Sequence, residues 1–388
     1  MYKKSLVIFL HQNIWDQSSL DALEVEKFKE HSNVVAYELG RFINKHMVPA
    51  FKNKLNKNYV RKPNSFFKWK RDFLNLIKKY NLKDILIINK VKPTNIWALL
   101  ILIELSKLKI NIVEYQNSGF PNFSSKKLFI EKLKIIINIP YVIRSVQSRL
   151  LNFFYKFLRF HSYYYLISGN LSKHYEKKKI IYGSSWDITK TFYKFKKLKI
   201  DYKFAVYVES TIAHTGDSIF LGPNAAKIDK KVWFNDLNKF FNNFEKKNKL
   251  KVIIAAHPKA YHAKNSKTYK HRKVIKNKTK ELISKAQFVF FERSTAINYI
   301  IKYKKPAAMI YNKETISTSY NKGIHMGFSK LTGIRNIDIE NYFMSDLEKI
   351  FEVKEDMYSK YYKKFINFKN RKIPNYQILK NKFLKKAL

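Results

Sequence analysis

The chain has 388 residues, of which 46% are hydrophobic, and it contains no cysteine. That length suits two domains of about 150–200 residues each, and the apolar content excludes a chain that is disordered throughout. Without cysteine there is no disulfide, no thiolate metal site and no cysteine nucleophile.

The formal net charge is +48, with 77 Lys and Arg against 29 Asp and Glu. Such an excess suits nucleic acid, anionic lipid or a phosphorylated substrate as a partner. An AT-rich genome also encodes many lysines, so part of the charge is expected on solvated surfaces. The apolar run at residues 5–10 is too short for a secretion signal or a membrane span. We therefore expect a cytoplasmic protein, peripheral at the inner face of the cell membrane.

In the first part of the chain, strand-like and helix-like stretches alternate. Short apolar runs predict strands at residues 5–10, 34–39, 84–88 and 110–114. Helical patterns predict helices at residues 20–31, 65–80 and 93–107, the first opened by Ser18 and Ser19 as capping candidates. Strands separated by helices predict a parallel sheet with helices on both faces.

Basic and apolar residues interleave at residues 125–160, where Arg144, Arg149 and Lys156 stand among aromatic residues. A basic amphipathic helix of this kind binds an anionic membrane surface through charge and shallow apolar burial. The alternative is that the apolar face of the helix packs on a domain.

The alternation resumes after about residue 165. Strands are predicted at residues 163–167, 204–208, 251–256, 287–291 and 306–310, and helices at 231–246, 279–285 and 294–302. The predicted fold class is α/β, with two Rossmann-like domains facing each other across a cleft. Their boundaries are placed at residues 1–165 and 166–350. A basic helical tail at 351–388 crosses back over the first domain or lies on the membrane.

Two polar clusters follow strands of the second part, at the position where open α/β sheets bind ligands. Glu209 and Asp217 come first, and such a carboxylate acts as a base, binds a sugar hydroxyl, or merely caps a turn. His257-Pro258-Lys259 comes next, with an imidazole and an ammonium that suit a phosphate. A chance His-Pro dipeptide is the alternative.

A third cluster, Glu292-Arg293-Ser294-Thr295, follows the predicted strand that ends at Phe291 and opens a predicted helix. Ser294 and Thr295 suit a helix N-cap, where backbone N–H groups bind an anion such as a diphosphate. Ordinary capping is the alternative. Because His257 and Ser294 follow consecutive strands of one predicted sheet, we expect them to open onto one crevice.

Together these motifs resemble a known family. Tyr207-Val-Glu-Ser, His214-Thr-Gly-Asp, Ala255-Ala-His-Pro-Lys and Arg293-Ser-Thr-Ala-Ile, within residues 163–315, look like surface-carbohydrate (capsule or lipopolysaccharide) glycosyltransferases of the GT-B type. The His-Pro and Ser/Thr pairs are also similar to those of bacterial sialyl- and Kdo-type transferases. In those families the pairs contact the phosphate of a CMP-sugar without a metal.

The resemblance implies a peripheral, nucleotide-sugar-dependent glycosyltransferase that acts on a surface glycan or glycolipid. A CMP-linked nonulosonic acid or Kdo-type sugar is a donor that it implies. The implied donor-binding residues are His257, Pro258, Lys259, Tyr261, Arg272, Thr279, Glu281, Arg293, Ser294 and Thr295. The segment from His214 to Asp217 departs from the His-Pro-Asp of relatives, and Arg293 replaces a common His or Ser, so the donor stays open.

The acceptor in such enzymes is held by the N-terminal domain. His11, Gln12 and Asp16 follow the first predicted strand, and polar residues 116–118 follow a later one. The catalytic base is then Glu209, Asp16 or His11, of which Glu209 is preferred. No cofactor or metal is expected, because there is no Asp-x-Asp pair and the ten His are scattered.

Two other classes of function compete with this interpretation. A nucleic-acid-binding protein would explain the charge and the 16% aromatic content. Against it, the sequence has no helix-turn-helix, zinc-finger, OB or RRM signature. A non-catalytic membrane-associated scaffold is the third interpretation, and it predicts that no nucleotide stabilises the protein.

Overall fold

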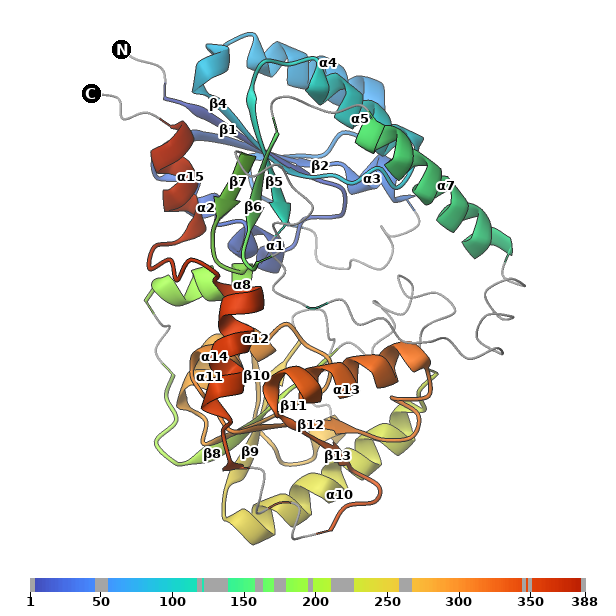
Figure 1. Ribbon diagram of the computed structural model, residues 1–388, viewed down its shortest axis with the longest axis vertical. Helices are drawn as coiled ribbons and strands as arrows, with labels where there is room; N and C mark the ends of the chain where they lie inside the picture. Colours follow the sequence, from blue (N-terminus) through green and yellow to red (C-terminus); the bar gives the residue numbers. More distant parts are fainter. Residues whose placement is uncertain are drawn as a thin grey trace. The chain divides into compact units, whose positions relative to one another are not determined.

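The computed structural model describes residues 4–45, 55–116, 121, 139–157, 163–170, 179–194, 198–210, 227–257, 267–343, 347 and 351–384. The chain divides into two compact units (Figure 1). The first unit comprises residues 1–118, 140–192 and 367–388, and the second comprises residues 119–139 and 193–366.

The first unit is built on a parallel sheet of seven strands. The strands are β1 (Leu6–His11), β2 (Asn33–Glu38), β3 (Val60–Arg61), β4 (Ile85–Lys90), β5 (Asn111–Gln116), β6 (Tyr163–Ile167) and β7 (Ile180–Tyr182). Their order across the sheet is β3-β2-β1-β4-β5-β6-β7. The direction of winding therefore reverses between β1 and β4, and such a reversal opens a ligand crevice beyond the carboxyl ends of the two strands.

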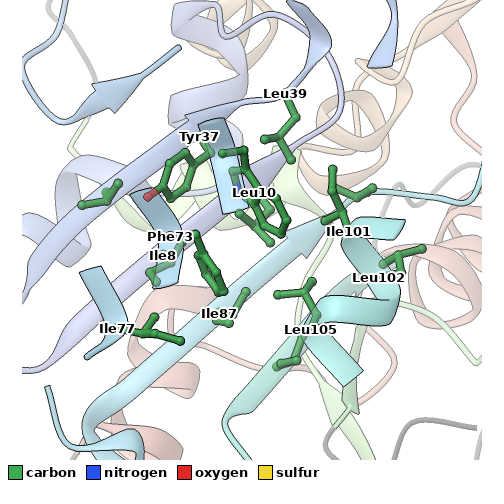
Figure 2. Packing of buried hydrophobic residues seen from close by; sticks show 14 of the residues in the cluster. Ile8, Leu10, Tyr37, Leu39, Phe73, Ile77, Ile87, Ile101, Leu102 and Leu105 are labelled. Carbon is green, nitrogen blue, oxygen red and sulfur yellow. The ribbon is translucent and has the colours of Figure 1, made fainter. Parts of the chain in front are cut away.

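Helices cover both faces of this sheet. They are α1 (Gln17–Ala22), α2 (Val25–Lys29), α3 (Gly40–Ile43), α4 (Phe66–Ile77), α5 (Ile96–Ser106), α7 (Ile139–Phe157), α8 (Trp186–Thr189) and α15 (Asn375–Phe383). Alternate residues of β1 serve opposite faces. Ile8 and Leu10 pack with α4 and α5 (Figure 2), whereas Val7 and Phe9 pack with α1, α2 and α15.

The second unit has a parallel sheet of six strands in the order β10-β9-β8-β11-β12-β13. The strands are β8 (Phe204–Val208), β9 (Lys251–Ala256), β10 (Val274–Lys276), β11 (Phe288–Phe291), β12 (Ala307–Tyr311) and β13 (Arg335–Asp338). The helices are α10 (Lys230–Asn248), α11 (Thr279–Lys285), α12 (Ile297–Lys302), α13 (Ser319–Thr332) and α14 (Glu355–Tyr361). Winding reverses between β8 and β11. Both units are thus Rossmann-like, which confirms the predicted α/β class with two such domains.

The boundary between the units differs from the predicted one at residue 165. That residue lies inside β6, which pairs with β5, and β7 extends the same sheet to Tyr182. The first unit therefore continues to residue 192. The predicted tail at 351–388 is divided as well, because α14 belongs to the second unit.

The end of the chain returns to the first unit, as one of the two predicted placements had it. Leu379 and Leu384 are buried in the core on the β1, α1 and α2 side. The Asn375 side chain accepts a hydrogen bond from Ser184 N–H at 2.9 Å and donates one to the Ser184 carbonyl at 2.8 Å. These contacts join α15 to the loop after β7.

Candidate functional site

The carboxyl ends of three neighbouring strands meet at one edge of the second sheet. Val208 at the end of β8 pairs with Ala255 of β9 on one side and with Phe291 of β11 on the other. His257 and Ser294 therefore follow the two strands that flank β8, which lie about 10 Å apart across the sheet. These strands are not consecutive as predicted, because β10 comes between them in the chain, but both end at the same edge of the sheet.

Glu209 is buried at this edge, with 2% of its surface exposed. Its carboxylate accepts hydrogen bonds from the backbone N–H of His257 at 2.9 Å and from the Tyr269 hydroxyl at 2.5 Å. Both oxygens are thus engaged by the protein. This arrangement positions the backbone of His257 at the end of β9, and it favours a positioning role over the predicted role of Glu209 as the base.

A second buried carboxylate, Glu292, lies one strand away. It accepts hydrogen bonds from the Tyr207 hydroxyl and, at 2.7 Å, from the Ser210 hydroxyl. Burial raises the pKa of Glu292 to about 7, and the charge of Glu209 adds to the rise, while the two hydrogen bonds oppose it. Sequence reasoning placed Glu292 directly after a strand, but its coupling to Glu209 depends on the pairing of β8 with β11.

Arg293 connects this edge to the amino end of α13. Its guanidinium donates to the Asn321 side-chain oxygen at 2.7 Å and lies 5.5 Å from the centre of the Tyr320 ring. Thr318 caps the 14-residue helix by accepting from the Asn321 N–H. The first-turn N–H groups of a helix lack partners within the helix and carry a partial positive charge. A cationic side chain beside them makes this corner suitable for an anion.

Sequence reasoning did not identify α13. Three hydroxyl residues, Thr315, Ser317 and Thr318, stand directly before the helix, and they are a capping signal that could have located its start. Its proximity to Arg293 depends on the tertiary fold.

Ser294 and Thr295 form a turn rather than the predicted N-cap. Ser294 Oγ accepts a hydrogen bond from the Ala296 N–H at 3.2 Å, and α12 begins only at Ile297, with Ala296 as its N-cap. The helix has 6 residues and no side-chain cap. The hydroxyls still lie at the carboxyl edge of the sheet, directly after Arg293.

The structure gives Arg272 a role different from the predicted one. Its guanidinium donates to Asn238, Asn242 and Glu245, all on α10, at 2.9, 2.6 and 2.6 Å. The residue is buried, with 6% of its surface exposed. Arg272 therefore ties the segment before β10 to α10 and has its main donors engaged there.

Thr279 and Glu281 belong to α11, which follows the edge strand β10. Glu281 is buried and lies 3.9 Å from the Lys280 ammonium nitrogen. These two residues are thus part of the helix layer. The predicted site residues Asp217, Pro258, Lys259 and Tyr261 lie outside the described residues, as do Asn117 and Ser118.

The carboxyl edge of the first sheet carries the residues predicted to face the acceptor. Asp16 caps α1, because its carboxylate accepts from the Ser19 N–H at 2.7 Å. The helix predicted to begin at residue 20 thus starts three residues earlier, at Gln17, and its cap is Asp16 rather than Ser18 or Ser19. Gln12 accepts a hydrogen bond from the Lys92 N–H at 2.7 Å, which joins the loops after β1 and β4.

His11, the last residue of β1, is half-buried and stacks on Trp15 with ring centres 4.6 Å apart. Its Nδ1 lies 3.2 Å from the Asn13 carbonyl oxygen. Because a carbonyl oxygen only accepts, this bond requires the proton on Nδ1. In the neutral ring, Nε2 then holds the lone pair that a general base uses.

The loop that carries His11 is held tightly. The Asn44 amide donates to the Gln12 carbonyl and to the Asn13 side chain, both at 3.0 Å. Gly40, at the start of α3, approaches so closely that an added Cβ would lie 2.7 Å from the carbonyl carbon of Asn13. A side chain at Gly40 would therefore displace this loop.

The helix α7 exposes its apolar residues. Six large apolar side chains on it are between 49% and 65% exposed, namely Ile139, Ile143, Val146, Leu150, Phe153 and Phe154. At about 100° per residue they form one stripe, called here the α7 stripe. Tyr155 projects from the opposite side and packs on the core beside α4 and α5. These six side chains therefore do not pack on the core of the first unit, whereas residues 125–138 and 158–160 of the predicted basic segment lie outside the described residues.

None of the helices in the described parts of the chain is long and apolar enough to cross a membrane. The described residues also contain no group of three or more His, Asp or Glu that could hold a metal ion.

Comparisons with known proteins find similarity in structure only. No family model matches the sequence, and no curated protein matches it. The structure of S. aureus MnaA with UDP is 12% identical, with a TM-score of 0.48 over 98% of this chain and 96% of that one. The glycosyltransferase SnogD from Streptomyces nogalater is 9% identical, with a TM-score of 0.48 over 98% and 99%.

UDP-GlcNAc 2-epimerase from Neisseria meningitidis, bound to UDP-GlcNAc, is 12% identical, with a TM-score of 0.42 over 91% of this chain and 95% of that one. At this level of similarity the three structures assign no activity to this chain.

Proposed function

We propose that this protein is a glycosyltransferase that takes a sugar from a nucleotide donor and transfers it to a surface glycan or glycolipid. The donor phosphate is placed at the carboxyl edge of the second sheet, at the reversal between β8 and β11. The observation that carries the proposal is the corner formed by Arg293 and the amino end of α13, where a guanidinium and helix N–H groups lie together.

The neighbouring groups suit the same ligand. The backbone N–H of His257 is held by Glu209, and the Ser294 and Thr295 hydroxyls follow Arg293 directly. Positive charge and hydrogen-bond donors at this edge stabilise the negative charge that develops on a departing nucleotide phosphate. The proposal requires no metal for this step.

For the donor we propose a CMP-linked acidic sugar of the nonulosonic acid or Kdo type. The support is the resemblance of the His257-Pro258 and Ser294-Thr295 pairs to those of sialyl- and Kdo-type transferases. The basic composition of the chain suits a donor with both a phosphate and a carboxylate.

For the base we propose His11 among the residues predicted to face the acceptor, because Asp16 caps α1 and Glu209 is buried. In the proposed transfer, the base takes the proton of the acceptor hydroxyl as that oxygen bonds to the anomeric carbon. The bond from that carbon to the phosphate oxygen breaks, and the nucleotide leaves with the electron pair. Proton transfer of this kind contributes about 10²–10⁴-fold to a rate.

We propose that the α7 stripe docks on anionic lipid at the inner face of the cell membrane. Exposed apolar patches of this kind mark interaction surfaces, and α7 is about 28 Å long. A second copy of the chain is a poorer partner, since each copy carries a formal net charge of +48. An anionic lipid surface can bury the apolar side chains of the stripe and attract the positive charge of the chain.

A nucleotide panel tests the donor site. CMP, UDP and GDP are compared for the rise in melting temperature that they cause, since a ligand that binds only the folded state stabilises it. We expect CMP to give the largest rise, and Arg293→Gln to abolish it. Arg335→Gln is the matched control, because Arg335 is exposed at the start of β13, on the opposite edge of the same sheet.

Transfer itself is tested with the nucleotide-sugar that the panel favours, by following release of the nucleotide with and without glycan acceptors. Acceptor-dependent release supports the proposal. Isomerisation of the sugar without an acceptor would identify a different reaction at the same site, and the absence of any nucleotide effect would favour the scaffold interpretation. Steeply salt-dependent, submicromolar binding of DNA or RNA would favour a nucleic-acid-binding protein.

A further inference from the structure

A lysine that forms no ion pair with any described carboxylate lies at the winding reversal of the first sheet. Lys90 ends β4 and pairs in register with His11 of β1, so the two backbones are about 4.8 Å apart. Side chains alternate along each strand, and Phe9 and Ile88 both belong to the core on the α1, α2 and α15 side. His11 and Lys90 therefore project on that same face, beyond the carboxyl end of the sheet.

Aromatic rings and one carbonyl surround the Lys90 ammonium. Its nitrogen lies 4.7 Å from the centre of the half-buried Trp186 ring and 6.0 Å from that of Tyr115. It donates one hydrogen bond, to the Tyr115 carbonyl oxygen at 3.2 Å. An ammonium has three donors, so two remain for other groups.

No carboxylate within the described parts of the chain forms an ion pair with Lys90. By contrast, two other half-buried cations of this unit have such partners, Arg41 with Glu38 at 2.8 Å and Arg61 with Asp72 at 2.6 Å.

The charged groups near Lys90 leave its ammonium undercompensated. Lys92, a second cation, stands two residues after Lys90. Glu114 on β5 carries a carboxylate. Its neighbours Val113 and Tyr115 lie on the same face of the sheet as Lys90, so the Glu114 side chain points to the opposite face. Burial lowers the pKa of Lys90 to about 8, with Lys92 acting in the same direction and Glu114 opposing it. A desolvated cation of this kind is stabilised by an anionic ligand.

We propose that Lys90 binds an anionic group of the acceptor, a phosphate or a carboxylate, beside the Trp186 ring. The acceptor assignment rests on the proposed transferase function, whereas the anion site itself does not. An anion bound by Lys90 would hold its sugar within reach of His11 on the neighbouring strand. The chemistry fits a phosphorylated or acidic sugar and the phosphate of a glycolipid.

Calorimetry with soluble probes tests the anion site on the full chain. Glucose 6-phosphate and glucuronate carry the anion on a sugar, dihexanoyl phosphatidic acid carries it on a lipid, and glucose is the neutral control. We expect an anionic probe to bind and glucose not to bind. The anionic probe that binds most tightly shows whether the anion is carried by a sugar or by a lipid. Equal binding of all four compounds would overturn the proposal.

Two variants separate a built site from general attraction to a basic surface. Lys90→Gln is expected to weaken anion binding about 10- to 100-fold, the range of a hydrogen bond to a charged group. Lys92→Gln is the matched control, an exposed lysine two residues away, and is expected to change binding less than twofold. Equal losses in both variants would mean unspecific attraction and would overturn the proposal.

Wild-type protein provides a readout that does not depend on the folding of a variant. Acetylation of lysines by an N-hydroxysuccinimide ester near pH 8, followed by mass spectrometry, reports each position. We expect Lys90 to be acetylated faster than Lys92 and to be protected by the anionic probe, while protection of both lysines or of neither contradicts the site. If nucleotides stabilise the protein but no anion protects Lys90, this inference fails and the transferase proposal stands. If an anion protects Lys90 but no nucleotide stabilises the protein, this inference stands and the transferase proposal fails.

Discussion

Glu209 accepts a hydrogen bond from the backbone N–H of His257 at 2.9 Å, across a separation of 48 residues. The same carboxylate also accepts from Tyr269, so one buried side chain fixes the end of β9 and the segment before β10. The residue that sequence reasoning preferred as a base thus holds the backbone of His257 in place.

This relationship predicts how Glu209→Gln behaves. A Gln has one accepting oxygen in place of two, so one of the two donors loses its acceptor. We expect the free energy of unfolding to fall by about 1–3 kcal/mol and nucleotide affinity to fall with it. Urea unfolding and calorimetry with CMP measure the two effects. A variant that binds the nucleotide normally but has lost all turnover would restore Glu209 as the base.

Tyr269→Phe should act in the same direction, since it removes one donor to Glu209. Its control is Tyr358→Phe. Tyr358 donates to the Lys305 carbonyl, at the amino end of β12 and so at the other edge of the sheet. The control should cost stability without weakening nucleotide binding.

The base assignment predicts a contrast between His11 and Asp16. His11→Gln should lower turnover about 10²–10⁴-fold with little change in nucleotide affinity, because only proton transfer is lost. Asp16→Ala should cost about 1 kcal/mol of stability through loss of the cap on α1 and leave turnover unchanged below its melting temperature. Steady-state kinetics and thermal unfolding measure both. Full activity of His11→Gln would remove His11 from the mechanism.

The α7 stripe predicts selective binding to lipid. Sedimentation with phosphatidylcholine vesicles, with and without phosphatidylglycerol, should show binding that needs the anionic lipid. Replacing Leu150 and Phe153 together with Ser should lower binding at least about tenfold, because each apolar side chain contributes about 1.5–3 kcal/mol when buried. Phe67→Ser is the control, since Phe67 is 72% exposed on α4. Equal losses in both variants would argue against docking through α7.

The raised pKa of Glu292 predicts a pH dependence of stability. The pKa is higher in the folded protein than in the unfolded chain, so folding favours the protonated carboxyl. This contribution is fully present below the unfolded value, near 4.5, and is lost as the pH rises through about 7.

The Glu292→Gln variant removes this titration. Relative to wild type, it should therefore gain about 2–3 kcal/mol between pH 4.5 and pH 8. Urea unfolding of both proteins at each pH gives the difference, in which other titrations cancel. Glu352→Gln, at an exposed glutamate of the same unit, should show no such gain. A flat difference for Glu292→Gln would contradict the raised pKa.

Much of the fold could be predicted from local patterns. Three strands, β6, β8 and β9, and the helix α11 have the bounds that the sequence predicted. For the strands the reason is that short apolar runs between turn signals are typical of parallel strands buried on both faces. The helix predicted at residues 20–31 is instead divided at Glu24, which adopts a left-handed backbone with φ of 55°. Local periodicity does not reveal such a break.

The amino-acid sequence by itself determined the α/β class, the order of the strands along the chain and the placement of polar motifs directly after them. Only the tertiary structure decided which of those polar residues are available to a ligand. Asp16 and Arg272 are engaged in a cap and in contacts to α10, while Arg293 meets a helix that begins 26 residues later in the chain, at Ser319. The physical reason is that hydrogen bonds and ion pairs form between groups that strand pairing brings together, and pairing follows the order across the sheet rather than the order along the chain.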